Sequence, residues 1–315
     1  MSYGMAQAAA NLPFSIATPH SLSEFRNAGF SGATSVPLSM TGPINLGDAQ
    51  SKKSVYTYLD CRQNSQNTNA PDPSAAVFSS TSNIGPDIWY INSATAVTQS
   101  TSNQYLDFSA GASSYAISNP STSTFTVSNY SFTMEAWIRP DNFTSGNFNT
   151  QAVMWRGGTG LRGDISTMNS GKIRFRWSGA DNGLQSSTTL STGTWYHVVG
   201  VYHVYNYVSS ANSENSGIAA VFINGSIDSL APLSGSRVQG NSNGDTTLMS
   251  FGFYNTQNRS SLNPAPSPTY DFFYNGRIGQ VRFYDGGLPP AKVLQNYNAT
   301  KGTYGYGSNS GTVFI

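Results

Sequence analysis

The stretch KIRFRW at residues 172–177 alternates apolar and basic side chains with a period of two. Successive side chains of an extended strand point to opposite faces, so each set would line one face of a sheet. The apolar set is Ile173, Phe175 and Trp177, and the basic set is Lys172, Arg174 and Arg176. The stretch FTMEAWIRP at residues 132–140 alternates in the same way until Pro140 ends the pairing. Both stretches predict half-buried strands.

The second half of the chain contains more strand patterns and one helical pattern. GIAAVFINGSI at residues 217–227 predicts a strand that runs into a hairpin turn at Asn224 and Gly225, because this pair tolerates positive φ. GRIGQVRFYDGGL at residues 276–288 predicts another strand, closed by glycines. LPPAKVLQNYN at residues 288–298 predicts a helix with prolines in its first turn. Together these patterns predict an all-β protein, a two-sheet antiparallel jelly-roll sandwich.

Composition divides the chain into an arm, a domain and a tail. Residues 1–53 hold a capping box at Ser21 and Glu24 but little to bury, so we expect an arm that a partner orders. Residues 54–306 form the predicted jelly-roll domain, and residues 307–315 form a tail. Long loops, where function usually lies in such folds, are predicted for four segments rich in Gly, Ser, Asn and Pro: residues 61–104, 142–171, 206–217 and 234–276.

Charge and cysteine content exclude several classes of protein. Only 10% of the 315 residues are charged, against about 25% in ordinary globular proteins. The net charge of +1 gives no broad field for a phosphate backbone, so we expect no nucleic-acid partner. The sequence has no signal-peptide pattern and no apolar run of about 20 residues, which predicts no membrane insertion. Cys61 is the single cysteine, which excludes an intrachain disulfide. A polar, nearly uncharged protein made in a cytosol indicates a viral structural protein assembled in a host cytoplasm.

Two of the three histidines lie in the apolar stretch GTWYHVVGVYHVY at residues 193–205. His197 and His203 would share one face of a strand but lie about 20 Å apart, at roughly 3.3 Å per residue. They cannot bind one metal ion together. We interpret His197 as a buried, hydrogen-bonded histidine of a central strand.

The carboxylates do not predict a catalytic site. A glycan hydrolase needs two carboxylates held across a cleft. The glutamates are Glu24, Glu135 and Glu214, and Glu135 has Thr133 and Trp137 as its neighbours on the same face. No catalytic residue is therefore predicted, although a pair converging from separate loops stays open.

Two turns offer clustered oxygen atoms that calcium accepts as ligands. GADNG at residues 179–183 supplies Asp181 and Asn182 as candidate Ca²⁺ ligands, and NSNGDTT at residues 241–247 is similar. A tight turn demands the same residue types, so the alternative is a purely structural turn. The basic set of residues 172–177 leaves open either an anionic glycan site or a solvated strand face.

Aromatic residues in the predicted loops are the candidate carbohydrate-binding residues. A flat ring can stack on a sugar while neighbouring amides bond its hydroxyls. The same rings could instead seal an end of the sandwich or a subunit interface. The candidates are Trp89, Tyr90, Tyr254, Tyr270, Phe272 and Tyr274, with Phe273 in the same cluster.

Several motifs in order resemble the laminin-G-like branch of the concanavalin A-like lectin/glucanase jelly rolls. They are NQYLDFSAGASSYAIS, YSFTMEAWIRP, STGTWYHVVGVY, AAVFINGSI and YNGRIGQVRFYDGGLPPAKVLQNYNATKG, and the resemblance in order and spacing extends through residues 54 to about 306. The resemblance implies a two-sheet sandwich whose rim or concave face often binds glycans, sometimes with calcium. Hydrolytic relatives carry a Glu-x-Asp-x-Glu strand, and this sequence has none.

The ends of the chain resemble bacteriophage proteins. LQNYNATKGTYG at residues 294–305 is similar to the end of such domains in phage and marine-virus proteins. SLSEFRNAG and PINLGDA, both within residues 1–53, resemble N-terminal segments of phage virion and tail proteins.

The sequence therefore predicts a phage virion protein, a tail, fibre or other appendage subunit. Residues 1–53 would bind other virion proteins, and the jelly roll would contact host surface glycans without chemistry. The alternatives are a purely structural decoration or neck subunit and, with little support, a glycan hydrolase. We expect a homo-oligomer, with trimers common in phage fibres, because the apolar end TVFI would otherwise be exposed.

Overall fold

The structure is a computed structural model that describes most of the second half of the chain and short strands of the first. The described residues are 55–59, 76–78, 89–92, 98–99, 105–108, 115–118, 131–144, 149–156, 161–178, 183–208, 215–234, 249–252 and 273–313. The predicted arm at residues 1–53 lies outside them.

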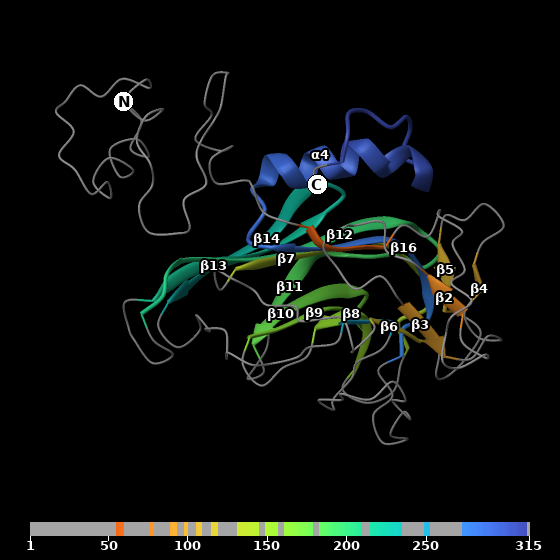
Figure 1. Ribbon diagram of the computed structural model, residues 1–315, viewed down its shortest axis with the longest axis horizontal. Helices are drawn as coiled ribbons and strands as arrows, with labels where there is room; N and C mark the ends of the chain where they lie inside the picture. The colour runs from red at the N-terminus through yellow and green to blue at the C-terminus, as the bar shows by residue number, and fades with distance from the viewer. Residues whose placement is uncertain are drawn as a thin grey trace. The chain divides into compact units, whose positions relative to one another are not determined.

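Two antiparallel sheets form a sandwich, which confirms the predicted fold class (Figure 1). Sheet A has the strand order β14 (Ser226–Ser234), β13 (Ser216–Ile223), β12 (Tyr196–Asn206), β7 (Phe132–Pro140), β16 (Gly276–Asp285), β5 (Leu106–Asp107) and β4 (Thr98–Gln99), and β1 (Val55–Leu59) pairs with β16. Sheet B has the order β11 (Leu184–Thr189), β10 (Lys172–Ser178), β9 (Leu161–Met168), β8 (Thr150–Arg156), β15 (Met249–Phe251), β6 (Tyr115–Ser118), β3 (Trp89–Asn92) and β2 (Ala76–Phe78).

The main core lies between the inner faces of the two sheets. Phe132 of β7 lies 5.8 Å, centroid to centroid, from Phe175 of β10 in the opposite sheet and 5.8 Å from Phe283 of β16. The alternation predicted at residues 172–177 is confirmed, because the apolar side chains are buried and the basic ones are half-buried. Period-two patterning therefore selects which face of each strand enters this core.

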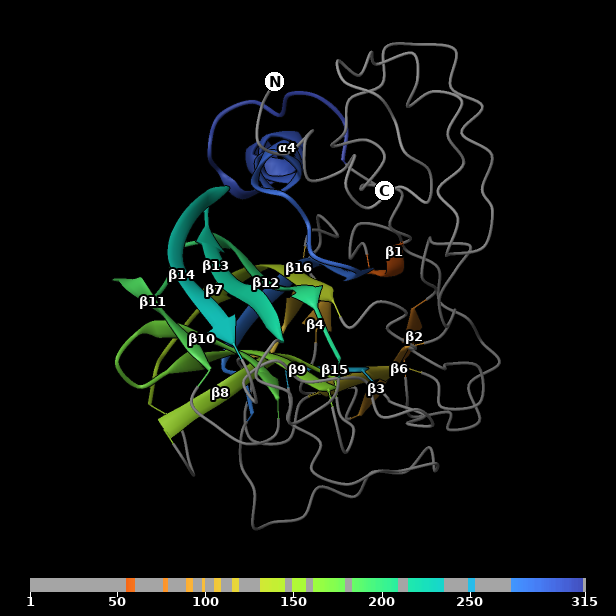
Figure 2. The same ribbon diagram turned by 90° about the vertical axis from the view of Figure 1, so that its left-hand side faces the viewer.

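A helix covers the middle of the outer face of sheet A. Helix α4 (Pro290–Thr300) has proline in its first turn, as predicted, and lies over sheet A in Figure 1, while Figure 2 views it end-on. A second apolar cluster fills the space beneath it: Val199, Val201, Ala220, Phe222, Tyr284, Leu288 and Val293. Strand β7 is consequently buried on both faces along most of its length. None of the described helices is long and apolar enough to cross a membrane.

The chain after α4 turns back along the helix. A 3₁₀ turn, η3 (Lys301–Tyr304), follows α4, and Gly305 with φ of 90° reverses the direction. The amide of Ser310 then donates to the carbonyl of Asn298 at 2.8 Å, and the Gln295 side chain donates to the carbonyl of Thr312 at 2.9 Å. Residues 305–313 are thereby held against α4. The predicted hairpin turn is also confirmed, with φ of 51° at Asn224 and 80° at Gly225.

Three of the predicted loops contain strands, so the loop prediction was wrong there. Residues 142–171 include β8 and β9 in the middle of sheet B, residues 234–276 include β15, and residues 61–104 include β2, β3 and β4. The strands β8 and β9 bury polar side chains, such as Gln151 and Asp164, that hydrogen-bond to other side chains. Because hydrogen-bonded polar groups are tolerated in the interior, polar composition did not predict exposure.

Replacing Gly200 tests the packing between the sheets. Gly200 lies on the inner face of β12, where an added Cβ would lie 2.2 Å from Cδ2 of Phe175. We expect Gly200→Ala to lower the free energy of unfolding by about 1–3 kcal/mol, because the buried ring has no space to move. Chemical denaturation measures the change. Gln185→Ala on exposed β11 is the control and should stay within about 0.5 kcal/mol of the wild type; equal stability of both variants would contradict the packing described.

Candidate functional site

The structure assigns different places to the aromatic residues predicted to bind carbohydrate. Trp89 and Tyr90 lie in β3, opposite Ser118 and Ile117 of β6, rather than in a loop. Tyr274 is 1% exposed and belongs to the core between the sheets, so its ring has no free face for a sugar. This burial corrects the prediction for Tyr274 and favours the alternative of sealing the sandwich. Tyr254, Tyr270 and Phe272 lie outside the described residues.

The candidate calcium ligands Asp181 and Asn182 also lie outside the described residues. Within the part of the chain that the structure describes, no group of three or more His, Cys, Asp or Glu side chains could hold a metal ion. On the basic strip of β10, the Arg176 guanidinium forms an ion pair with the carboxylate of Asp164 on β9. Opposite charge therefore neutralises one cation of the strip that was considered for an anionic glycan.

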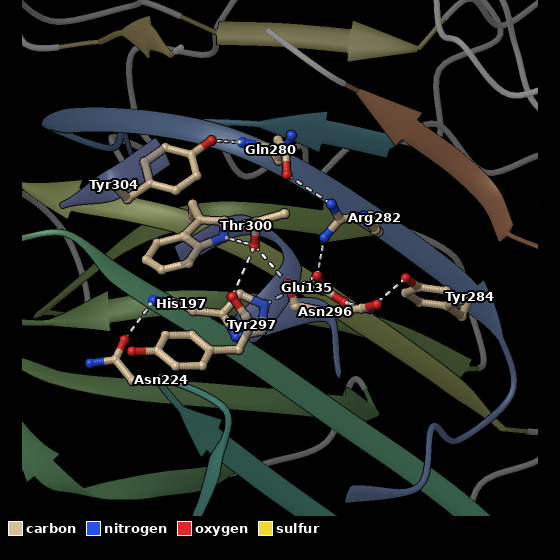
Figure 3. Close-up of polar contacts among 11 residues, drawn as sticks. Glu135, His197, Asn224, Gln280, Arg282, Tyr284, Asn296, Tyr297, Thr300 and Tyr304 are labelled. Atoms are coloured by element: carbon tan, nitrogen blue, oxygen red, sulfur yellow. Dashed lines mark hydrogen bonds and ion pairs between the residues drawn. The ribbon is translucent and has the colours of Figure 1, made fainter. Parts of the chain in front are cut away.

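A buried network of polar side chains lies between sheet A and α4 (Figure 3). At its centre, the Glu135 carboxylate on β7 accepts from Nη1 of Arg282 on β16 and from Nδ2 of Asn296 on α4, the latter at 2.7 Å. His197 Nε2 on β12 lies 3.1 Å from the same carboxylate. Arg282 also donates to Gln280 at 2.8 Å. The network therefore joins three strands and the helix, and the hydrogen-bonded interpretation of His197 is confirmed.

The charge state of Glu135 follows from these partners. Burial raises the pKa of the Glu135 carboxyl. The positive charge of Arg282 and the hydrogen bonds with His197 and Asn296 lower this pKa by more than burial raises it, and the result is a pKa of about 2. Glu135 is therefore ionised across the physiological range. Its exposed fraction is 0%, so no substrate can touch it.

A stack of rings connects this network to the surface. The Trp137 indole donates to Thr300 Oγ1 at 2.9 Å and stacks on Tyr304, with centroids 4.3 Å apart. The Tyr304 hydroxyl accepts from the amide of Gln280 at 2.9 Å (Figure 3). On its other side Tyr304 lies 4.7 Å, centroid to centroid, from Trp195, whose carbonyl accepts from the Tyr306 hydroxyl. Residues that follow α4 therefore support the ring of Trp195.

Trp195 is part of a half-buried group on the outer face of sheet A that we call the aromatic shelf. The shelf consists of Tyr105, Asp107, Arg139, Asp141, Trp195 and Arg277. The rings of Tyr105 and Trp195 lie 5.6 Å apart, and the Arg277 guanidinium lies 4.8 Å from the centroid of Tyr105. Strand pairing brings these residues together, because Arg277 is opposite both Arg139 and Asp107.

The charged groups of the shelf form two ion pairs. Arg277 Nε lies 2.9 Å from Asp107 Oδ2, and Arg139 Nη1 lies 3.0 Å from Asp141 Oδ1. Arg139 Nε also donates to the Gly193 carbonyl at 2.8 Å. Burial lowers the pKa of Arg277, but the hydrogen bond and charge of Asp107 raise it above its ordinary value. The four side chains keep 17–30% of their surface exposed, so each of them is in contact with solvent.

The shelf combines flat rings with hydrogen-bonding groups, but it was not among the predicted sites. Trp195 lies in the stretch at residues 193–205 and Arg139 in the stretch at residues 132–140, which were predicted as separate strands without a common site. The signal that could have joined them is the same period-two pattern, since Glu135, Trp137 and Arg139 share one face. The pairing of β16 with both β7 and β5 was still needed to bring Tyr105 beside Trp195.

Comparison with known proteins gives a family and a fold. A family model described as the concanavalin A-like lectin/glucanases superfamily, of laminin-G type, matches residues 109–294. Trypanosoma rangeli sialidase in complex with the inhibitor DANA is 15% identical, with a TM-score of 0.50 over 79% of this chain and 33% of the sialidase. The same sialidase with 2,3-difluorosialic acid, as the covalent intermediate, is 15% identical, with a TM-score of 0.51 over 80% and 34%.

A third structure is similar over nearly its whole length. Domain 4 of AbnA, a GH43 extracellular arabinanase from Geobacillus stearothermophilus in complex with arabinotriose, is 14% identical, with a TM-score of 0.48 over 77% of this chain and 97% of that domain. No curated protein matches the sequence. The chain spans about one third of the length of the sialidases, and the likeness to them concerns the fold alone.

The ion network predicts a specific dependence of stability on pH. Because folding lowers the pKa of Glu135 from 4.5 to about 2, its contribution to stability is complete above pH 4.5 and is lost as the pH falls through 2. We expect Glu135→Gln to lower the free energy of unfolding at pH 7 by about 3 kcal/mol or more, since Arg282 stays buried without its counter-charge. The variant should also lose much of the acid dependence between pH 4.5 and 2.

Chemical denaturation at pH 7, 4.5 and 3 measures both effects. Asp141→Asn is the control, because it removes one charge from a half-buried pair that is open to solvent and should cost less than about 1 kcal/mol. A Glu135→Gln variant as stable as this control, with an unchanged pH profile, would show that the network does not hold α4.

Proposed function

The chain belongs to the concanavalin A-like lectin/glucanase superfamily, and from this premise we propose that it binds glycans without catalysing their turnover. The observation that carries the proposal is the aromatic shelf, where Trp195 and Tyr105 lie 5.6 Å apart beside two ion pairs. A flat ring packs against the apolar face of a sugar, and the surrounding polar groups bond its hydroxyls. The shelf supplies both kinds of contact, with each ring one residue before a strand of sheet A, β5 for Tyr105 and β12 for Trp195.

The proposed absence of catalysis is supported by the state of the carboxylates. A glycosidase needs one protonated carboxylic acid and a second carboxylate across the bond to be cleaved. Glu135 is fully buried and ionised, whereas Asp107, Asp141 and Asp164 each form an ion pair with an arginine. Asp228 accepts from the amides of Ser187 and Thr188. Each carboxylate whose side chain the structure describes is thus already engaged by an arginine or by backbone amides, which argues against a role as general acid.

The proposed setting is a bacteriophage virion, in which residues 1–53 bind other virion proteins and the jelly roll contacts host surface glycans. A charged fraction of 10% without cysteine pairing supports a protein assembled in a host cytoplasm and exposed later. The resemblance of SLSEFRNAG and PINLGDA to phage virion segments supports the same setting. Homo-oligomerisation is part of this proposal.

A purely structural subunit is the second candidate, and exposed apolar side chains favour it. Ile227 and Leu230 on the edge strand β14 and Leu294 on α4 are about half exposed. Side chains of this kind are covered in subunit contacts more often than in sugar sites. Glycan binding by the isolated protein separates the two candidates.

The first test removes the central ring of the shelf. We expect the full chain to bind members of a glycan array, and Trp195→Ala to weaken that binding at least about tenfold, as removal of a central aromatic contact usually does. Tyr205→Ala is the matched control, because Tyr205 is a 62% exposed ring at the other end of β12. Melting temperatures verify folding, and the glycans are analysed for cleavage products after incubation. Binding unaffected by Trp195→Ala, or cleavage of a glycan, would contradict the proposal.

The second test concerns the arm. We expect deletion of residues 1–53 to leave a soluble domain with the β-type circular-dichroism spectrum of the full chain and unchanged glycan binding, because Lys53–Ile315 forms one unit with its own core. The truncated chain should no longer enter phage particles, as measured by immunoblotting of purified virions. An unfolded product, or normal incorporation, would count against the proposed role of the arm.

A further inference from the structure

The charges of the aromatic shelf indicate which class of glycan it takes. Two cations, Arg139 and Arg277, and two anions, Asp107 and Asp141, lie around the two rings. Each cation already contacts a carboxylate within 3.0 Å, so the net charge of the shelf is zero. We propose that the shelf binds an uncharged glycan, an inference that rests on the proposed function and specifies its ligand.

Hydrogen-bond chemistry supports this ligand class. A sugar hydroxyl donates one hydrogen bond and accepts others, so it needs an acceptor and a donor close together. In each ion pair a carboxylate is the acceptor and a guanidinium, with five N–H donors, is the donor. The pairs Arg277–Asp107 and Arg139–Asp141 therefore present alternating donors and acceptors on the shelf, with the Arg277 guanidinium over the ring of Tyr105. Neighbouring hydroxyls of a neutral sugar match this alternation.

An anionic glycan at the shelf would be attracted by the arginines and repelled by the carboxylates. Its carboxylate or sulfate would approach Arg277, but Asp107 at 2.9 Å already occupies Nε of that guanidinium. The charges of Asp107 and Asp141 would repel the ligand, since like charges at close range are unfavourable. Lys301 does not alter this balance, because its ammonium lies over Tyr297 and hydrogen-bonds to Asn298 on α4.

The basic residues elsewhere in the described chain do not form a competing anion site at the shelf. Arg282 is buried in the network under α4, and Arg176 is paired with Asp164 on sheet B. Selection against anionic sugars would therefore arise from local pairing of charges, because the net charge of the whole chain is only +1. Changing one shelf carboxylate should reverse it.

The experiment removes one negative charge and keeps the shape of the shelf. Asp107→Asn retains an oxygen that accepts from Arg277 but leaves the shelf with a net charge of +1. The full-length wild type and the variant are tested on an array in which each oligosaccharide is present unmodified, sulfated and with a terminal sialic acid. We expect the wild type to bind at least one unmodified glycan about tenfold or more tightly than its charged forms, with little change between 50 and 300 mM salt.

The variant should shift this ratio toward the charged forms by about tenfold and should acquire salt-dependent binding, as expected for one unpaired cation. Asp228→Asn is the matched control, because it makes the same change of charge on β14, four strand spacings or about 19 Å from β16, and should leave the ratio unchanged. If Asp107→Asn unfolds, Asp141→Asn tests the same reasoning in the second pair.

The outcomes separate this inference from the proposed function. Tighter binding of charged glycans by the wild type, or an unchanged ratio in the folded variants, would overturn the inference and leave glycan binding intact. Absence of binding to any glycan would overturn the proposed function and this inference with it.

Discussion

The ion pair between Glu135 and Arg282 is the interaction on which the outer half of this structure depends. Both side chains are fully buried, and burying two charges is unfavourable unless their hydrogen bonds are made. Asn296 of α4 and His197 of β12 supply bonds to the carboxylate, and Gln280 supplies one to the guanidinium. The most favourable position of α4 is therefore the one that brings Asn296 onto Glu135, which fixes the helix on the sheet.

The position of α4 determines what the surface presents. The chain leaves the helix through η3, where Tyr304 stacks on Trp137 and supports Trp195 from beneath. Tyr306 then donates to the carbonyl of Trp195. A shift of α4 would withdraw these supports, so direct contacts connect the buried network to the half-buried ring of Trp195. Because these contacts already hold the Trp195 ring in place, a ligand that binds it loses less free energy in ordering this side chain.

Sequence patterns predicted the parts of the fold in which each buried side chain is apolar and can be recognised from its own residue type. The period of two placed β7 and β10 correctly, and Asn224–Gly225 located the hairpin. The strands β8 and β9 were missed because hydrogen bonds among Gln151, Asp164 and their neighbours allow polar residues inside. The shelf was missed for another reason. Its members come from four separate segments, and their proximity follows from strand pairing that no local pattern encodes.

Glu135 illustrates why residue type alone does not identify chemistry in this fold. A glutamate on a strand, with a tryptophan beside it on the same face, is where a hydrolase would be sought, and the same superfamily name covers lectins and glucanases. The partners decide the role: an arginine, an amide and an imidazole hold this carboxylate ionised and inaccessible. The shelf carboxylates are likewise matched with arginines. In a chain with so few charges, pairing leaves the half-buried rings and neutral hydrogen-bonding groups of the shelf as the means of recognition, and an uncharged glycan is the ligand that we propose for such a surface.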